Sequence, residues 1–284
     1  MNNRQKKPSW IKVKLPMGGE YNKLQRLVST HKLNTICQSA SCPNIAECWG
    51  KGVATFMILG NICTRSCKFC GVKTGRPEKI DWEEPKKVAE SIKILNVKHA
   101  VLTSVNRDDL KDMGVSLWVE TINEIRFFNP HVTIETLIPD FKGEKKIIEK
   151  IINVKPEVIS HNLETVPRLT KKVRVQAKYN RSIEVLQYIK NRNNNIRTKT
   201  GIMLGLGETI EEVIRTMEDI KMSKVDILTI GQYLQPSLKH YPVHSFIHPE
   251  QFKELRYIGL KMGFKYVESG PLVRSSYHAD KHVK

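Results

Sequence analysis

Cysteine is scarce in this chain of 284 residues, and its six cysteines all fall within the first quarter of the sequence. Six cysteines are too few for a disulfide scaffold in a chain of this length. The sequence also lacks the run of about 18 apolar residues that a membrane-spanning helix needs. Residues 1–16 lack the apolar core of a signal peptide. We therefore expect a cytoplasmic protein with no membrane partner, in which clustered cysteines serve metal or redox chemistry.

Acidic residues are in deficit as well, because 29 Asp and Glu stand against 47 Lys and Arg, a net charge of +18. Such a balance is typical of proteins that bind nucleic acids or acidic partners. However, the basic residues are spread along the chain, and no arginine-rich block with interleaved aromatic residues is present. We therefore expect no nucleic-acid partner and interpret the charge as a solvated basic surface.

Short apolar runs typical of buried strands alternate with amphipathic segments typical of helices. The runs expected to form strands are residues 53–59, 100–104, 132–137, 158–162, 200–204 and 227–233. The segments expected to form helices are residues 84–95, 116–128, 144–152, 181–190 and 209–222, followed by a helix at 249–261 and a possible strand at 265–268. This alternation predicts an α/β fold with a parallel sheet, open or partly closed as a barrel.

Polar side chains follow several of these strands, at the carboxyl edge where parallel sheets build their sites. They occupy residues 104–109, Glu135, 161–164 and 205–208. Each group has a plain structural interpretation. Gly205 and Gly207 suit a tight turn, Asp108 and Asp109 suit a helix cap, and His161 suits a buried hydrogen bond. None of these features indicates a function by itself.

The cysteines form two groups of three. Their spacings are C-x4-C-x5-C for Cys37, Cys42 and Cys48, and C-x3-C-x2-C for Cys63, Cys67 and Cys70. Three thiolates leave a four-coordinate metal centre one ligand short, and an open position favours chemistry over a structural role. Zinc sites are usually built from paired C-x2-C knuckles with four protein ligands, whereas three cysteines in one loop can hold three corners of a cubane cluster.

The second group follows the first predicted strand directly, and in this it resembles the signature of the radical S-adenosylmethionine (SAM) enzymes. The resemblance implies a partial (β/α)6 barrel of the TIM-like kind. It implies that Cys63, Cys67 and Cys70 hold a [4Fe-4S] cluster whose open iron binds SAM. It also implies that Phe69, which precedes the last cysteine, approaches the adenine of SAM.

Within that superfamily the chain is similar to the lipoyl synthases over nearly its whole length. The similarity rests on the first cysteine group and on segments that stand in the family's order, namely KPSWIKVKLP, ATFMILG, ICTRSCKFC, SVNRDDL, HNLETVPRLT, GIMLGLGET, QYLQPSLKHYPVHSF and SGPLVRSSYHAD. It implies an N-terminal extension at residues 1–52, a barrel at 53–235 and a C-terminal extension at 236–284. It further implies a second, auxiliary [4Fe-4S] cluster on Cys37, Cys42 and Cys48, with Ser276 of the RSSY motif as fourth ligand and Ser275 as the alternative.

The activity implied by this resemblance is the insertion of two sulfur atoms at C6 and C8 of a protein-bound octanoyl group, with the auxiliary cluster as sulfur donor. A serine alkoxide is a poor match to iron-sulfur centres, which suits a cluster that gives up sulfur. The implied partners are octanoylated lipoyl carrier domains, such as the E2 subunits of 2-oxoacid dehydrogenases and the glycine cleavage H protein, and an electron donor such as flavodoxin or ferredoxin. Such carriers are commonly acidic, so we expect the basic surface to speed their encounter.

SAM presents a carboxylate, an amino group and ribose hydroxyls, which need a cation and acceptors. The residues that we expect to supply them are Ser104, Asn106, Glu135, Asn162 and Arg174. The chain departs from the family at Asn106, where an aspartate is usual, so the acceptor oxygen is kept and the charge is lost. Further departures from the usual residues are Asn61, Met113 and Val175.

Two alternatives stay open at this point. A zinc protein would explain the cysteines and the charge, but it needs four protein ligands and, for DNA binding, a recognition helix. Another sulfur-inserting radical SAM enzyme, acting on a biotin precursor or on tRNA, would share only the second cysteine group. The preferred carrier, the reductant, the way the auxiliary cluster is rebuilt and the oligomeric state do not follow from the sequence.

Overall fold

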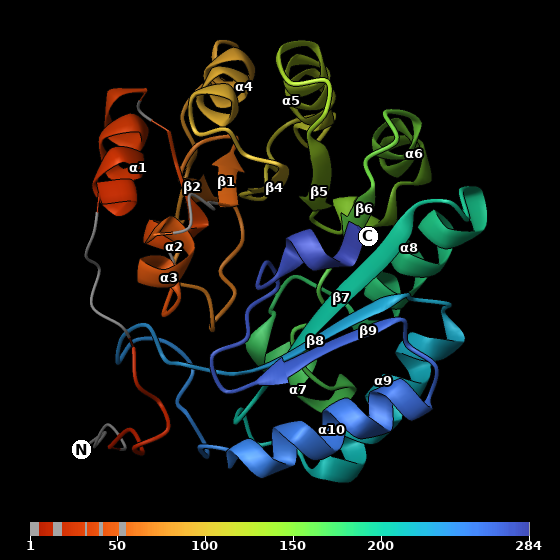
Figure 1. Ribbon diagram of the computed structural model, residues 1–284. Helices are drawn as coiled ribbons and strands as arrows, with labels where there is room; N and C mark the ends of the chain where they lie inside the picture. The colour runs from red at the N-terminus through yellow and green to blue at the C-terminus, as the bar shows by residue number, and fades with distance from the viewer. Residues whose placement is uncertain (1–5, 14–18, 32, 40–41, 51–54, 284) are drawn as a thin grey trace. The chain divides into compact units, whose positions relative to one another are not determined.

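The computed structural model describes residues 6–13, 19–31, 33–39, 42–50 and 55–283 of the chain (Figure 1). These residues fall into two compact units, which are described separately. The segments of unit 1 are Met1–Lys12, Ser66–Gly71 and Ile159–His278, and those of unit 2 are Val13–Arg65, Val72–Val158 and Ala279–Lys284. Val53 and Ala54, which begin the first predicted strand, lie outside the described residues.

The strands of unit 2 are short and parallel. β1 (Thr55–Ile58) pairs with β4 (His99–Ser104), and β4 pairs with β5 (Thr133–Leu137). Thr55 lies opposite Val101 in the first pair. Every residue of β1 and all but the last of β4 are buried, as expected for apolar runs in a parallel sheet that is covered on both faces.

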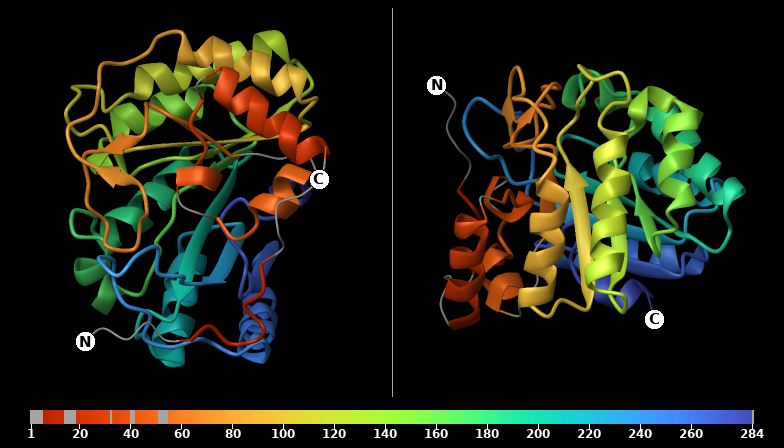
Figure 2. Two further views of the ribbon diagram at one scale, coloured as in Figure 1. Left: turned by 90° about the vertical axis from the view of Figure 1, so that its left-hand side faces the viewer. Right: turned by 90° about the horizontal axis from the view of Figure 1, so that it is seen from above.

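Three helices of unit 2 follow its strands or connect them. They are α4 (Glu84–Ile94), α5 (Val115–Phe128) and α6 (Lys145–Asn153), and a 3-10 turn, η1 (Phe141–Gly143), precedes α6. α4 packs against α5 (Figure 2). Each helix buries apolar residues on one face, such as Ile148, Ile151 and Ile152 of α6. A second 3-10 turn, η2 (Ala279–Val283), also belongs to unit 2.

The N-terminal part of unit 2 contains three helices that the apolar pattern did not predict. They are α1 (Gly19–Thr30), α2 (Ile36–Ser39) and α3 (Ile45–Gly50), and the last two are too short to show helical periodicity. Before α2, Thr35 bridges antiparallel to Phe56 of β1, and the Met57 N–H donates to the Asn34 carbonyl at 2.9 Å. The segment that carries the first cysteine group is therefore tied to the first strand.

A small parallel ladder follows β1 in unit 2. β2 (Ile62–Cys63) pairs with β3 (Lys73–Thr74), and the Gly75 N–H donates to the Cys63 carbonyl at 3.0 Å. This ladder closes the loop that carries the second cysteine group.

Unit 1 contains the last three strands, which are also parallel. They are β7 (Arg197–Leu204), β8 (Ile227–Gln232) and β9 (Tyr266–Gly270). The helices of unit 1 are α7 (Pro167–Val173), α8 (Tyr179–Arg192), α9 (Ile210–Met222) and α10 (Pro249–Lys261). A capping box formed by Thr209 and Glu212 begins α9, and the apolar faces of these elements share one core that includes Leu204, Met217 and Leu255.

Hydrogen-bonded strands follow the order β1-β4-β5-β6-β7-β8-β9, with the division between the units falling inside β6 (Val158–Ser160). All six predicted strands are present within a few residues of their expected bounds, and the possible strand at 265–268 is β9. The predicted helices are present as α4, α5, α6, α8, α9 and α10, whereas α7 was not predicted. No helix in the described part of the chain is long and apolar enough to span a membrane. The division into two extensions and a barrel stays a prediction.

Candidate active site

The loop that follows β1 begins at a tight turn held by a buried carboxyl group. Leu59 and Gly60 both have positive φ, 68° and 86°. The Glu84 carboxylate, at the start of α4, accepts the Leu59 N–H at 2.7 Å and also bonds the Gly60 N–H. Burial raises the pKa of Glu84 to about 7, and the two backbone donors only partly offset it. This carboxyl group holds the start of the loop that carries the second cysteine group.

The Cys63 sulfur is the target of three N–H groups of unit 2. The Asn106 backbone N–H donates to it at 3.3 Å, the Arg65 N–H at 3.4 Å and the Asn106 Nδ2 at 3.8 Å. A thiolate that ligates iron carries negative charge, and hydrogen bonds to such sulfurs tune a cluster and hold its ligands in place. The donor set around Cys63 therefore fits an iron-sulfur ligand.

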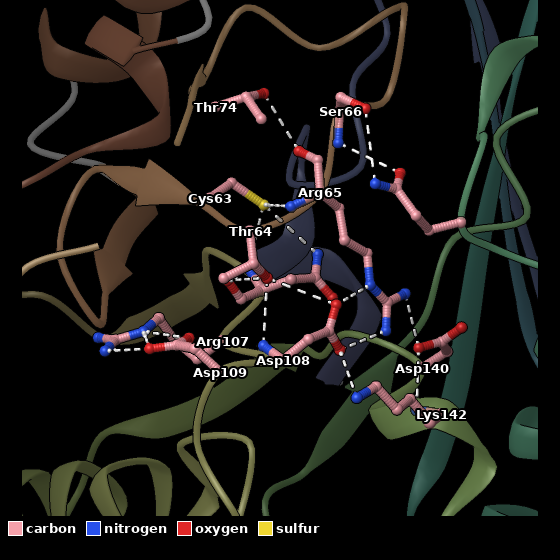
Figure 3. A network of polar contacts seen from close by, with 12 residues as sticks. Cys63, Thr64, Arg65, Ser66, Thr74, Arg107, Asp108, Asp109, Asp140 and Lys142 are labelled. Carbon is pink, nitrogen blue, oxygen red and sulfur yellow. Dashed lines mark hydrogen bonds and ion pairs between the residues drawn. The ribbon is translucent and has the colours of Figure 1, made fainter. Parts of the chain in front are cut away.

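Arg65, between the first two cysteines of this group, points away from Cys63 into a buried network of ion pairs (Figure 3). Its Nε and Nη2 atoms donate to the Asp108 carboxylate at 2.6 and 2.8 Å, and its Nη1 atom forms an ion pair with Asp140 at 2.8 Å. The Arg65 side chain is 5% exposed and that of Asp140 is not exposed at all. The bidentate pair holds the pKa of Asp108 below its usual range.

The interpretation of Asp108 and Asp109 as helix caps is wrong. Asp108 holds Arg65, and Asp109 accepts from Arg107 at 2.9 Å. The N–H of Ser116, in the first turn of α5, donates instead to Asp112 at 3.0 Å. Charge pairing with arginine thus prevails over capping for both carboxylates.

Cys67 and Cys70 belong to unit 1, whereas Cys63 belongs to unit 2. Within unit 1 the Lys68 N–H donates to the Val173 carbonyl at 2.9 Å, and the Tyr241 N–H donates to the Lys68 carbonyl at 2.8 Å. His240 Nε2 donates to the Cys70 carbonyl at 3.0 Å. The adjoining Phe69 packs against the apolar core of unit 1.

Besides Asn106, two of the residues expected to contact SAM lie in unit 2, and both are engaged within the protein. Ser104 ends β4, and its Oγ accepts from the Trp118 indole at 3.2 Å. Glu135 lies inside β5 rather than at its end, which corrects the placement made from sequence. Its side chain is 1% exposed and lies 3.8 Å from the His99 ring. The face of the sheet to which this carboxylate belongs is set by the two-residue alternation of side chains along β5.

Asn162 and Arg174, which were also expected to contact SAM, lie in unit 1, where the structure gathers polar residues from distant segments. The Ser275 hydroxyl donates to Asn162 Oδ1 at 3.2 Å, and Asn162 Nδ2 donates to Glu164 at 3.0 Å. Arg174 is buried and donates from Nη1 to the Leu163 carbonyl at 2.9 Å. Burial raises the pKa of Glu164, opposed by the nearby Arg174 and the Asn162 amide.

Glu164 was not among the expected site residues. Its φ is positive, 66°, and it bridges parallel to Ile202 of β7. The signal available in the sequence was its place among the polar residues 161–164 that follow a predicted strand. The other interpretations made for this edge hold. His161 makes a structural hydrogen bond to Ser182 at 2.9 Å. Gly205 forms a turn in which a Cβ atom would collide with the Ser245 carbonyl and with Gln232.

The first cysteine group lies in unit 2, on and between α2 and α3. The Cys42 N–H donates to the Cys37 carbonyl at 2.9 Å, so these two cysteines lie close together. Burial and the neighbouring Cys42 raise the pKa of the Cys37 thiol to about 11. The Thr55 N–H and the Trp49 indole lie against the same sulfur and oppose that rise.

None of the six cysteines, all of which lie in the described segments, forms a disulfide. Within those segments no group of three or more His, Cys, Asp or Glu side chains is arranged to hold a metal ion. Ser276 is half-buried and belongs to unit 1. The assignment of the seven ligands therefore stays a prediction.

Comparison with known proteins identifies the family. Residues 57–220 match the radical SAM superfamily, and residues 1–42 match the N-terminal domain of lipoyl synthase of that family. The chain is 65% identical to a lipoyl synthase of Flavobacterium psychrophilum over 277 residues, which cover 98% of this chain and 95% of that protein. It is 63% identical to a mitochondrial lipoyl synthase of Nematostella vectensis over 99% of this chain and 96% of that one.

Solved structures show the same fold at low sequence identity. Methylornithine synthase (PylB) matches with a TM-score of 0.58 and 16% identity, covering 87% of this chain and 81% of that one. HydG, a maturase of the [FeFe]-hydrogenase, matches with a TM-score of 0.58 and 12% identity, covering 93% of this chain and 75% of that one. The partial barrel predicted from sequence is confirmed.

The two family models cover Cys63, Cys67 and Cys70 of the second cysteine group and Cys37 and Cys42 of the first, and membership of this family excludes the zinc-protein alternative. The chain belongs to the lipoyl synthase family of radical SAM enzymes, which insert sulfur with the help of a [4Fe-4S] cluster and SAM.

Proposed function

We propose that the chain inserts sulfur at C6 and C8 of an octanoyl group borne by a lipoyl carrier domain, with an auxiliary cluster as the sulfur donor. The observation that carries the proposal is the Cys63 sulfur, which three N–H groups face in the loop of a radical SAM signature. The carrier substrate is supported by the names of the lipoyl synthases to which the chain is similar. The electron donor is a small redox protein such as flavodoxin or ferredoxin.

Cys63, Cys67 and Cys70 are the proposed ligands of the cluster that works with SAM. When bound, this cluster and SAM supply the one-electron chemistry that removes hydrogen from unactivated carbons. The protein's part is to hold the ligands and keep the pocket dry. Arg65 helps to hold Cys63 in place, because its ion pairs with Asp108 and Asp140 orient its own backbone N–H toward the Cys63 sulfur.

The proposed SAM contacts are Ser104, Asn106, Glu135, Asn162 and Arg174, with Phe69 against the adenine. Asn106 directs its Nδ2 toward Cys63, so its Oδ1 is the atom that accepts from a ribose hydroxyl. Within unit 1, the guanidinium of Arg174 lies close enough to Glu164 to lower the pKa of that carboxyl. The carboxylate of SAM would compete with Glu164 for the positive charge of Arg174.

Cys37, Cys42 and Cys48 are the proposed ligands of the auxiliary cluster, and Ser276 completes it. The hydroxyl of Ser275 already donates to Asn162, which favours Ser276 over its neighbour. Residues 1–42, which match the lipoyl synthase N-terminal domain, include Cys37 and Cys42. The chemistry of this donor set, three thiolates and one alkoxide, fits a cluster that is consumed.

An anaerobic reaction with SAM, a chemical reductant and an octanoyl-lysine peptide tests the proposal. We expect mass spectrometry of the peptide to show the addition of two sulfur atoms. The matched control is Cys42→Ala, which should still cleave SAM to methionine and 5′-deoxyadenosine but should add no sulfur. SAM cleavage by the unmodified protein without sulfur addition would contradict the proposed substrate while leaving the radical SAM chemistry intact.

A further inference from the structure

Trp49 carries a buried N–H group that makes no hydrogen bond of regular geometry. The side chain lies in α3, directly after Cys48, and is not exposed to solvent at all. Its Nε1 atom makes no regular hydrogen bond to any of the described residues. Leaving such a donor unpaired costs about 1–3 kcal/mol, so an orphaned indole N–H in a folded core calls for an explanation.

The comparison with Trp118 shows that a buried indole N–H of the same unit can find a hydrogen-bond acceptor within the protein. Trp118 is equally buried, in α5 of the same unit, and its Nε1 donates to Ser104 at 3.2 Å. Trp49 instead packs at a tilt on Tyr21, with ring centroids 5.2 Å apart, which fixes the plane of the indole. The orientation of the orphaned N–H is therefore set by packing.

The N–H group of Trp49 lies against the sulfur of Cys37, and the Thr55 N–H approaches the same sulfur. A neutral thiol is a weak acceptor, which explains why no regular hydrogen bond forms there. A thiolate bound to iron carries negative charge and is a good acceptor, and ligands of metal centres are commonly held by such outer donors. The orphaned donor thus fits a state of Cys37 in which it is a cluster ligand.

We propose that Trp49 is a positioning residue of the auxiliary cluster, whose indole N–H donates to the Cys37 sulfur when that sulfur ligates iron and so slows the loss of the cluster. The inference rests on the auxiliary cluster of the proposed function. It adds a residue outside the cysteines and the RSSY motif, and it assigns that residue to one ligand. It also explains why a large residue with a polar edge stands beside Cys48 where phenylalanine would fill the core as well.

The test isolates the auxiliary cluster in the full-length chain. The background variant Cys63→Ala/Cys67→Ala/Cys70→Ala, reconstituted anaerobically with iron and sulfide, should hold about four irons per chain. Trp49→Phe and, as the matched control, Trp118→Phe are then made in that background. The measurement is the rate at which iron passes to an excess of a chelator, followed by absorbance.

We expect Trp49→Phe to lose iron about tenfold faster than the background, as is typical when an outer hydrogen bond to a metal ligand is removed. Trp118→Phe should stay within about twofold, because its N–H bonds Ser104 and not a cysteine. Urea unfolding of the iron-free proteins separates the two possible roles of the indole. A residue that serves only packing would lower the stability with and without iron, whereas removing an orphaned donor should leave the iron-free stability unchanged or raised.

If Trp49→Phe does not fold, 3-benzothienylalanine at position 49 keeps the ring shape and removes only the N–H. Equal rates of iron loss for the variant and its background would overturn the role of Trp49 while leaving the auxiliary cluster in place. A background protein that binds no iron would overturn the auxiliary cluster and, with it, this role. The two failures are therefore distinguishable in one experiment.

Discussion

The two cysteine groups look alike in sequence, yet the structure builds the surroundings of Cys63 and Cys37 differently. The Cys63 sulfur is faced by three N–H groups, and the next residue but one, Arg65, is anchored by two carboxylates. The Cys37 sulfur is buried, the pKa of its thiol is raised to about 11, and the Trp49 N–H beside it makes no regular hydrogen bond. The first environment is assembled by the protein alone, whereas under the proposal above the second would be completed by the auxiliary cluster.

This difference matches the fates proposed for the two clusters. A cluster that works repeatedly with SAM needs ligands that keep one geometry through many reactions, and prearranged donors provide that. A cluster that is consumed must be released and replaced, so its pocket must tolerate an empty state. A neutral, buried thiol is a stable empty state, because no charge is left without a partner.

The largest expected effect comes from removing Arg65, which anchors the loop of Cys63, and it tests whether the surroundings of Cys63 are prearranged. Arg65→Met removes the guanidinium that pairs with the buried Asp140 and the half-buried Asp108, so we expect the free energy of unfolding to fall by about 4 kcal/mol. Urea unfolding of the iron-free protein measures it. Arg126→Met is the control, because Arg126 is 39% exposed, pairs with the surface residue Glu157 at 3.5 Å and otherwise bonds only a backbone carbonyl, that of Lys155, among the described residues.

The control variant should lose less than about 1 kcal/mol. Reconstituted Arg65→Met should also lose iron chiefly from the site at Cys63, leaving the auxiliary cluster, and iron analysis of the variant in a Cys37→Ala background checks this. Similar iron loss from both sites would show that Arg65 supports the whole unit and not one loop.

A smaller effect tests the turn that begins the same loop. The pKa of Glu84 is raised from 4.5 to about 7 in the folded protein, so the folded state holds this proton more tightly than the unfolded chain. The stability that the protonated group contributes is full below about pH 4.5 and is lost as the pH rises through about 7. The expected loss is about 3 kcal/mol over that range.

Glu84→Gln removes this titration, so the stability difference between the unmodified protein and the variant should change by that amount between pH 4.5 and pH 8. Urea unfolding at several pH values measures the difference, and subtraction cancels the other carboxylates, including Asp81 nearby. A difference that does not vary with pH would show that Glu84 is not the group that titrates.

Much of the fold could be predicted from the sequence because its signals are local. Apolar runs such as residues 100–104 form strands wherever both faces of a sheet are covered, and β4 occupies His99–Ser104. The spacing of Cys63, Cys67 and Cys70 likewise indicates a cluster loop without knowledge of its surroundings. The short helices α2 and α3 lack such a signal, because each spans too few residues to show a period.

The contacts of the site could not be predicted, because they join segments that are far apart in the sequence. In the sequence Asp108 stands before a predicted helix and suits a helix cap. Only the folded chain shows that it forms an ion pair with Arg65 instead. Asp140 gave no signal at all, since one acidic residue in a loop is common. Nothing in the sequence sets Trp49 apart, and the role proposed for it rests on a hydrogen bond that its indole N–H does not make in the folded chain.

The least of the expected effects concerns the reactivity of Cys37 in the iron-free protein. Alkylation requires the thiolate, and a thiol whose pKa is about 11 instead of 9.0 is about 100-fold less ionised at pH 8. We therefore expect iodoacetamide to modify Cys37 about 100-fold more slowly in the folded protein than in urea, as measured by mass spectrometry of its peptide. The half-buried Cys63 is the internal reference. The rate at Cys37 should keep rising with pH beyond 9, and a plateau near pH 9 would show that the pocket is open to water and that the two cysteine environments are alike.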